Sequence, residues 1–347
     1  MRFILILILL PFSIFSQEKD SLKIKVSGFL ETYYAYDFSN PTTDTKLPFM
    51  YNYNRHNEFN VNNGLIRAQL QYGNTYASIA VHAGTYVDDN YASEDIKLVS
   101  EAYVGMYLND NKKSSIEVGI MPSYIGFESA TTATNLTLTR SILAENSPYF
   151  MTGIKYNYKP SDKWSFSGLV TNGWQRINRP DKTVTPALGT QIIYKPSEKA
   201  TLNWITFIGK EFYGTELAMR YFSNLYWDNT WNSKWRTILG FDFGIQDSSS
   251  MNDEHLFWMS PVFIAQYSIN PKWQTAVRVE YYQDEDNVIV ATSDAFKTSG
   301  ASINFDYLLN SKVKLRTEAR YFDSKEAIFF DTKTNNFFVT TSLSFEF

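Results

Sequence analysis

Charged residues recur at every second position near the C-terminus, in the run VKLRTEARYF of residues 313–322. The charged positions are Lys314, Arg316, Glu318 and Arg320. Successive side chains of an extended chain point to opposite faces, so these charges share one face while Val313, Leu315 and their alternate neighbours form an apolar one. Such a strand suits a wall between lipid and a water-filled lumen.

Similar runs elsewhere supply the other charges of this predicted lumen wall. The candidates are Arg67, Arg236, Arg278, Glu280, Arg316, Glu318 and Arg320. Facing charges of both signs would order water and favour polar over apolar solutes. The alternative is that opposite charges form structural bridges across strands, and the sequence leaves both interpretations open.

The longest connection in the chain, residues 122–149, is a second candidate site. Its charges are Glu128, Arg140 and Glu145, set among many Ser and Thr residues. Long ordered loops in compact proteins are usually functional. We expect this loop to fold inward as a constriction, against the alternative of an external cap on the rim.

Aromatic and basic residues suggest a third site, in which Tyr and Trp faces and a guanidinium would hold a polar ligand such as a sugar. The candidates for ligand contact are Tyr51, Tyr53, Arg55 and Trp174. The plainer interpretation, which we favour, is a loop anchored by aromatic packing and a contact between Arg55 and Glu58. Trp174 then belongs to an aromatic girdle.

Catalysis has little support in the sequence. The chain holds three histidines, His56, His82 and His255, and no cysteine. We predict no enzyme activity, no metal and no cofactor; the acidic runs 252–254 and 284–287 would bind Ca²⁺ only weakly.

The elements that must position these residues are strands. Alternating runs recur about every twenty residues and are separated by seven short turns and eight longer connections, one of them near 211–217. Fifteen connections give sixteen strands, although fourteen or eighteen stay open. The predicted fold is an all-β, antiparallel up-and-down transmembrane barrel with short turns and both termini in the periplasm.

Both ends of the chain carry targeting features. Residues 1–16 have the early cation Arg2, an apolar run and a terminal small residue, which together indicate a secretory signal peptide before a single barrel domain, 17–347. The final Phe347 resembles the aromatic end recognised by the barrel-assembly machinery. Aromatic residues reach 17% although mean hydropathy is only −0.30, as expected of strands with one lipid face and one water face. The net charge of −4 gives no sign of a nucleic-acid partner.

Several segments resemble the putative β-barrel porin-2, OmpL-like family of Bacteroidetes outer membranes. The matching segments are 28–38 (GFLETYYAYDF), 51–62 (YNYNRHNEFNVN), 119–130 (GIMPSYIGFESA), 137–150 (TLTRSILAENSPYF) and 167–177 (SGLVTNGWQRI). The resemblance implies a porin-type barrel in a Gram-negative outer membrane. By analogy with general porins, the third loop, 122–149, would set the pore width.

We therefore expect a channel for diffusion of small hydrophilic solutes. Its expected partners are outer-membrane lipid, the assembly machinery and small polar solutes, and association into a homotrimer stays open. The alternative is a structural or adhesive barrel whose loops bind a partner and whose lumen is closed. The solute and the ion preference are not determined by the sequence.

Overall fold

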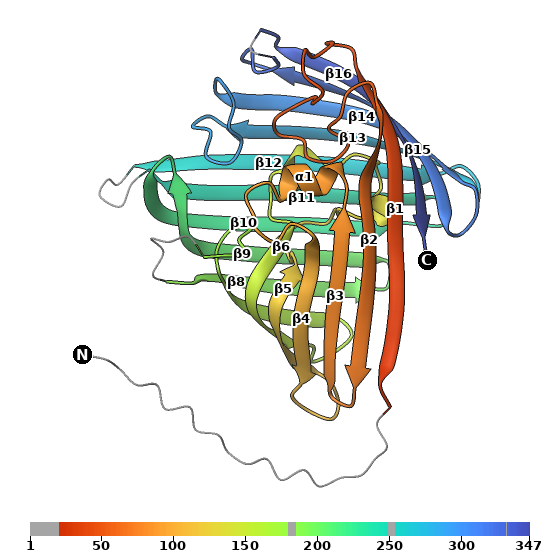
Figure 1. The fold of residues 1–347 in the computed structure, drawn as a ribbon, viewed down its shortest axis with the longest axis vertical. Helices are drawn as coiled ribbons and strands as arrows, with labels where there is room; N and C mark the ends of the chain where they lie inside the picture. Colours follow the sequence, from red (N-terminus) through yellow and green to blue (C-terminus); the bar gives the residue numbers. More distant parts are fainter. Residues whose placement is uncertain (1–20, 180–184, 249–253, 331) are drawn as a thin grey trace.

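The fold is a closed antiparallel β-barrel of sixteen strands, seen in a computed structural model that describes residues 21–179, 185–248, 254–330 and 332–347. Each strand pairs with its neighbours in sequence, and β1 pairs with β16 to close the barrel (Figure 1). The strands are β1 Lys23–Asp37, β2 Phe59–Tyr72, β3 Thr75–Ala83, β4 Val99–Tyr107, β5 Ser114–Pro122, β6 Phe150–Tyr158, β7 Trp164–Thr171, β8 Ala187–Ser197, β9 Ala200–Tyr213, β10 Glu216–Thr230, β11 Trp235–Asp247, β12 His255–Ser268, β13 Trp273–Asp284, β14 Phe296–Leu308, β15 Val313–Ser324 and β16 Asn335–Glu346. The predicted fold class and strand number are confirmed.

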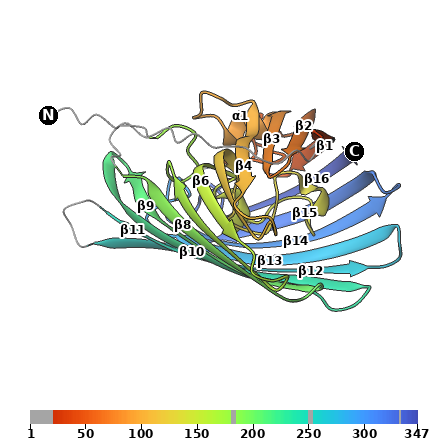
Figure 2. The ribbon, with the colours of Figure 1, turned by 90° about the horizontal axis from the view of Figure 1, so that it is seen from below.

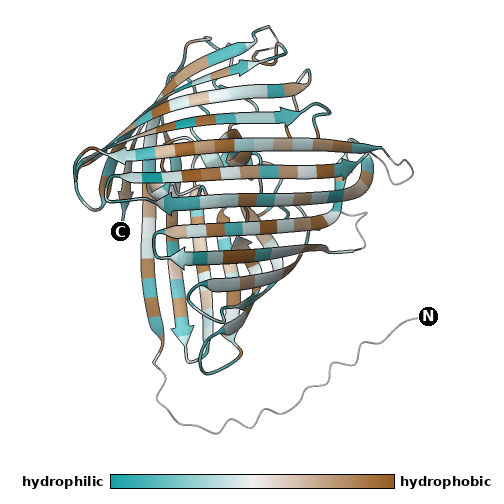
Figure 3. Cartoon of the chain, turned by 180° about the vertical axis from the view of Figure 1, so that it is seen from behind, coloured by the Kyte–Doolittle hydropathy of each residue, from teal (hydrophilic) through white to brown (hydrophobic). Residues whose placement is uncertain are grey.

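Hydrophilic and hydrophobic residues alternate along many of the strands (Figure 3), and buried positions alternate with exposed ones. In β15 the interior positions Arg316, Glu318 and Arg320 are fully buried, whereas Leu315 and Tyr321 on the other face are about 40% exposed. The exposed face is an apolar band, because aliphatic and aromatic side chains that a soluble domain would bury lie on its outside.

Aromatic pairs cross neighbouring strands beside the short turns. Trp164 stacks on Tyr194 with ring centroids 4.4 Å apart, and the corresponding pair Trp273 and Tyr307 is separated by 4.6 Å. These pairs lie at the same end of the barrel and form part of a ring at the border of the apolar band. Such a ring is the aromatic girdle expected where lipid tails meet headgroups.

The connections differ from prediction at one place. The predicted long connection near 211–217 is a tight turn, in which only Gly214 and Thr215 separate β9 from β10. Gly214 has a φ of 58°, a left-handed conformation that glycine adopts without steric cost. Polar residues such as Glu211 and Glu216 resembled a loop but belong to the strands β9 and β10.

The helices of the described chain are short and lie in long loops. They are α1 Thr85–Asn90, the 3₁₀ turn η1 Thr132–Thr134 and α2 Ile142–Glu145. Across the described ranges, no helix combines the length and apolar character needed to cross a membrane.

Candidate functional site

The loop between β5 and β6, residues 123–149, lies in the barrel interior. Figure 2 shows its yellow segment between the walls of the barrel. Apolar side chains of the loop, including Leu143 from α2 and Leu136, pack in one cluster with Ile264 from the inner face of β12. The loop therefore occupies part of the lumen cross-section.

Arginines on the inner wall hold the main chain of this loop. Arg278 on β13 donates to the carbonyl oxygen of Thr139 at 2.7 Å. Arg316 on β15 donates to the carbonyl oxygens of Thr132 and Asn135 at 2.9 and 3.0 Å. A loop removed from water needs such partners for its carbonyl groups, because it has no strand ladder of its own.

Wall carboxylates accept hydrogen bonds from the amides of the same loop. The Thr139 N–H donates to Glu318 at 2.6 Å, and the Ile142 N–H donates to Glu280 at 2.7 Å. Glu280 also pairs with Arg320 at 2.5 Å, so the anchors form a charged network. Charge-assisted bonds of this kind are among the strongest that side chains make.

The predicted exposure of these wall charges to lumen water is wrong for five of them, because the loop covers them. The five are Arg278, Glu280, Arg316, Glu318 and Arg320. The remaining two behave differently: Arg67 is partly exposed and pairs with Glu101, and Arg236 is partly exposed and pairs with Asp228 at 2.7 Å. The seven predicted wall residues thus divide into a buried anchor set and two residues nearer water.

The predicted acidic residues of the loop are also engaged. Glu128 accepts a hydrogen bond from the Ser141 N–H at 2.9 Å. Glu145 accepts from the Tyr51 N–H and from the Asn52 amide, both at 3.0 Å. The second contact fastens residues 123–149 to the loop between β1 and β2.

Two predicted ligand contacts belong instead to the structure of that first loop. Tyr53 is fully buried and donates its hydroxyl to Glu31 at 2.7 Å, so it is not accessible to a ligand. Arg55 pairs with Asp89 at 2.7 Å, and not with Glu58 as predicted.

The prediction that Trp174 is a girdle aromatic is wrong. Its ring lies inside the barrel, with centroids 5.0 Å from Phe207 and 4.8 Å from Phe222. Together with Tyr51 and Arg220 it lines a cavity of about 200 Å³ on the side of the long loops. Tyr51 and Trp174 therefore remain near a space that a solute could enter.

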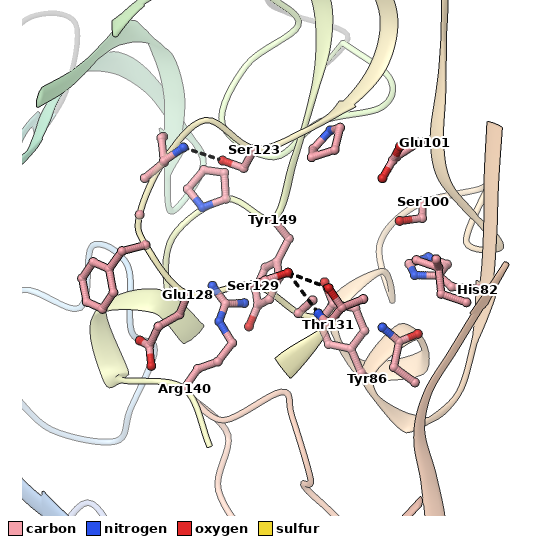
Figure 4. A pocket seen from close by; sticks show the side chains of 18 of the residues that line it. His82, Tyr86, Ser100, Glu101, Ser123, Glu128, Ser129, Thr131, Arg140 and Tyr149 are labelled. Atoms are coloured by element: carbon pink, nitrogen blue, oxygen red, sulfur yellow. Dashed lines mark hydrogen bonds between the residues drawn. The ribbon is translucent and has the colours of Figure 1, made fainter. Parts of the chain in front are cut away.

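A second cavity, of about 300 Å³, lies deeper in the barrel (Figure 4). One side is formed by β2, β3, β4 and β10, and the other by loop residues 122–131 with Arg140 and Tyr149. Its charged residues are Arg67, Glu101, Glu128 and Arg140. This cavity lies on the side of the loop away from the anchors on β13 and β15.

Arg140 differs from the anchoring arginines. Its guanidinium carbon lies 3.9 Å from the centroid of the Tyr149 ring, and the side chain lines the deeper cavity (Figure 4). Among the described residues, its Nε and Nη1 atoms have no hydrogen-bond partner.

The three histidines occupy separate places. The ring of His82 lines the deeper cavity, His56 accepts a hydrogen bond from the Asp37 N–H at 3.0 Å, and His255 lies 2.8 Å from Asp247 at the end of the barrel. The structure therefore does not gather them into one site.

Two residues that hold the loops were not among the predicted site residues: Glu31, and Lys314, which was placed on the inner face but not among the wall residues that bind the loop. Glu31 joins β1, β16 and two loops, because it accepts hydrogen bonds from Tyr53, Thr132 and Ser342. Lys314 donates to the carbonyl oxygen of Ala133 at 2.7 Å and is a further anchor. The alternating pattern of each strand places both residues on its inner face, and this was the signal that could have identified them. Their hydrogen-bond partners come from distant segments, which no local sequence pattern indicates.

Lys46 in the first loop is an unusual buried cation. It is 2% exposed, and its ammonium lies 4.1 Å from the centroid of the Phe338 ring. Burial lowers the pKa of the Lys46 ammonium to about 7, although the nearby Asp37 carboxylate acts in the opposite direction.

We predict that Lys46 makes the stability of the protein depend on pH. Between pH 7 and the ordinary pKa of 10.5, the unfolded chain binds more protons at this site than the folded chain. The free energy of unfolding should therefore rise with pH, by about 1 kcal/mol per unit within that window. Lys46→Met should remove this slope and be most stabilising relative to wild type at the low-pH end.

Thermal melting in detergent between pH 6 and 10 measures this dependence. Lys312→Met, at an exposed turn, is the matched control and should retain the wild-type slope. Parallel curves for wild type and Lys46→Met would contradict the prediction.

Comparison with protein families gives one match across almost the whole chain. The model of the family described as putative beta-barrel porin-2, OmpL-like, matches residues 23–347. No curated protein sequence matches the chain significantly.

Solved structures with a similar fold are outer-membrane channels with low sequence identity. The outer membrane channel DcaP of Acinetobacter baumannii is 14% identical with a TM-score of 0.66, covering 94% of this chain and 97% of that chain. An anion-selective porin from Comamonas acidovorans is 10% identical with a TM-score of 0.63, covering 94% and 100%. OmpF of Salmonella typhi, solved with daunomycin, is 13% identical with a TM-score of 0.61, covering 93% and 97%. At these identities the likeness shows the fold.

Proposed function

Because this chain belongs to the putative beta-barrel porin-2, OmpL-like family, and is thus a porin-type channel of the Gram-negative outer membrane, we propose that small hydrophilic solutes diffuse through it past a constriction made by loop 122–149. The observation that carries the proposal is the attachment of this loop to interior charges of β13 and β15. A loop held there reduces the space open to a solute.

The proposed passage follows the two cavities. The shallower one is lined by Ser147 and the deeper one by Pro148 and Tyr149, and the two share no lining residue. The short segment 147–149 therefore separates the shallower cavity from the deeper one. We infer that the narrowest point lies here, where Tyr149 receives a hydrogen bond at its hydroxyl from Asn52 and donates one to Glu145.

The lining of the passage favours polar solutes. Both cavities present charged groups and hydroxyls, including Arg67 and Ser129 in the deeper one and Arg220 in the shallower one. A water-filled path with fixed charges of both signs disfavours apolar molecules.

Single-channel recording in planar bilayers tests this function. The purified protein should give discrete conductance steps in KCl, and a salt gradient should give the ratio of cation to anion permeability. Absence of steps from correctly folded protein would refute diffusion and support the structural or adhesive alternative.

The membrane arrangement forms a further part of the proposal. Residues 1–16, proposed as the leader, lie outside the described residues. We propose that both termini of the chain face the periplasm and that Phe347 is recognised by the barrel-assembly machinery. Support comes from the even strand number and from Phe347 completing the closing edge, where its N–H and carbonyl both bond Gly28.

The orientation of β15 relative to lipid gives a direct prediction. Ala319 lies on the outer face between Ile303 and Val339 of the neighbouring strands. Ala319→Arg should therefore cost about 2 to 4 kcal/mol if the site lies near the bilayer midplane. Folding yield in liposomes, followed by heat-dependent gel mobility, measures the effect.

Ala319→Leu is the matched control, because it adds bulk without charge. It should fold as wild type does. Equal folding yields for the Arg and Leu variants would show that this face does not meet hydrocarbon.

A further inference from the structure

Arg140 is one of two buried interior arginines that lack a carboxylate within 4 Å among the described residues; the other, Arg220, donates a hydrogen bond to the side-chain oxygen of Gln246 at 2.7 Å. Like Arg278, Arg316 and Arg320, Arg140 is almost completely buried. Each of those three has a carboxylate partner within 4 Å among the described residues, whereas Arg140 has none. Buried N–H groups normally have acceptors that replace their lost water, and two nitrogen atoms of the Arg140 guanidinium have none among the described residues.

The main chain holds this side chain in place. The Arg140 carbonyl oxygen accepts from Arg320 at 2.6 Å, and Ser141 caps the following helix α2 by accepting from the Ala144 N–H at 3.2 Å. The guanidinium then lies against Tyr149, a contact that orients it through cation–π attraction. The group is therefore positioned beside the cavity before any ligand arrives.

Glu145 and Glu128 attract the Arg140 guanidinium electrostatically, but neither lies within ion-pair distance of it among the described residues. Both oxygens of Glu145 accept hydrogen bonds from other groups. One oxygen of Glu128 accepts from Ser141, and its other oxygen faces Arg278 at 3.8 Å. Burial raises the pKa of the Glu128 carboxyl above its ordinary value, although Arg278 opposes this.

The space beside Arg140 can hold a small organic molecule. Its volume of about 300 Å³ is at the lower end of the range for ligand pockets. Ser129 and Thr131 provide hydroxyls, while Ile125 and Phe127 provide an apolar surface (Figure 4 shows the polar side). An apolar surface close to a cation favours an organic anion over a fully hydrated inorganic one.

We propose that this cavity is a binding subsite for a small organic carboxylate in transit, with the carboxylate on Arg140 and the carbon chain toward Ile125 and Phe127. The planar guanidinium matches a carboxylate and donates charge-assisted hydrogen bonds to it. This inference rests on the proposed channel function and names a solute class for it.

Single-channel recording of the wild-type protein in KCl, with increasing concentrations of propionate added, tests this proposal. Bound propionate should reduce the single-channel current, and this reduction should saturate as the propionate concentration rises. Arg140→Met keeps an unbranched side chain against Tyr149 but removes the charge, so its half-saturating concentration should rise about tenfold or more. Arg140→Lys should lie between the two.

Arg236→Met is the matched control, because it also removes one interior cation but lies outside the lining of the deeper cavity. It should leave the half-saturating concentration close to wild type. An equal shift in both variants, or a response that never saturates, would overturn the subsite. Inorganic phosphate acting as strongly as propionate would overturn the organic carboxylate assignment.

A second measurement separates failure of the subsite from failure of the channel. Saturation-transfer NMR on the full-length protein in detergent should detect propionate bound to wild type and a clear loss of signal in Arg140→Met. If the NMR signal were present but the bilayer showed no conductance steps, the proposed diffusion would be refuted and the subsite would not. Conducting channels without the signal and without saturable block would refute the subsite alone.

Discussion

Deletion of residues 129–139 is expected to raise single-channel conductance several-fold. The carbonyl oxygens of Thr132 and Thr139 in this segment accept hydrogen bonds from the wall arginines of β15 and β13. Removal of the segment therefore opens the side of the lumen next to these strands. The barrel wall should survive, because its sixteen strands are closed by their own hydrogen-bonded ladder. The uncovered charges would then be hydrated by lumen water.

The ends of the deleted segment lie close enough to rejoin. Glu128 accepts a hydrogen bond from the Ser141 N–H at 2.9 Å, so a short glycine linker can replace the segment without pulling on either side. Deletion of Pro41–Thr43, at the mostly exposed tip of the first loop, is the control and should leave conductance unchanged. Equal conductance of wild type and the 129–139 deletion would show that the loop does not limit the passage.

The barrel was predictable because its signal is local. Alternation in 313–322 records the inside and outside of β15, and the Pro, Asn and Ser residues of the short turns mark strand ends. The same reasoning failed at 211–217, where polar residues continue two long strands to a tight turn. Glu211 on the inward face accepts from the Trp174 N–H at 2.6 Å, a partner that no local pattern reveals.

The environment of the interior charges was not predictable for a related reason. The alternation of residue types shows that Arg320 points into the barrel, but it does not show which groups surround the side chain there. Whether an inward charge meets water or a folded loop depends on the path of 123–149, some 180 residues away in sequence. Arg320 is buried and Arg236 is partly exposed, although both lie on the inner face of their strands.

Glu318 provides the strongest expected effect of a single substitution. Its carboxylate accepts from the Thr139 N–H at 2.6 Å and from the Thr139 hydroxyl at 2.9 Å, and it pairs with Arg278 at 2.7 Å. Glu318→Ala leaves a buried guanidinium and a loop amide without this partner. Removing one member of a buried ion pair costs about 3 to 5 kcal/mol.

This loss should be seen as release of the loop before the barrel unfolds, because the strand ladder does not depend on Glu318. Hydrogen exchange should show lost amide protection over residues 132–141, and single channels should show new open levels with frequent transitions. Glu318→Gln keeps an acceptor for the Thr139 N–H but not the charge, so its effects should be intermediate. Glu346→Ala removes an exposed carboxylate at the end of neighbouring β16 and should behave as wild type. If Glu318→Ala matched that control in exchange and in channel noise, the buried charges would not be what holds the loop in the lumen.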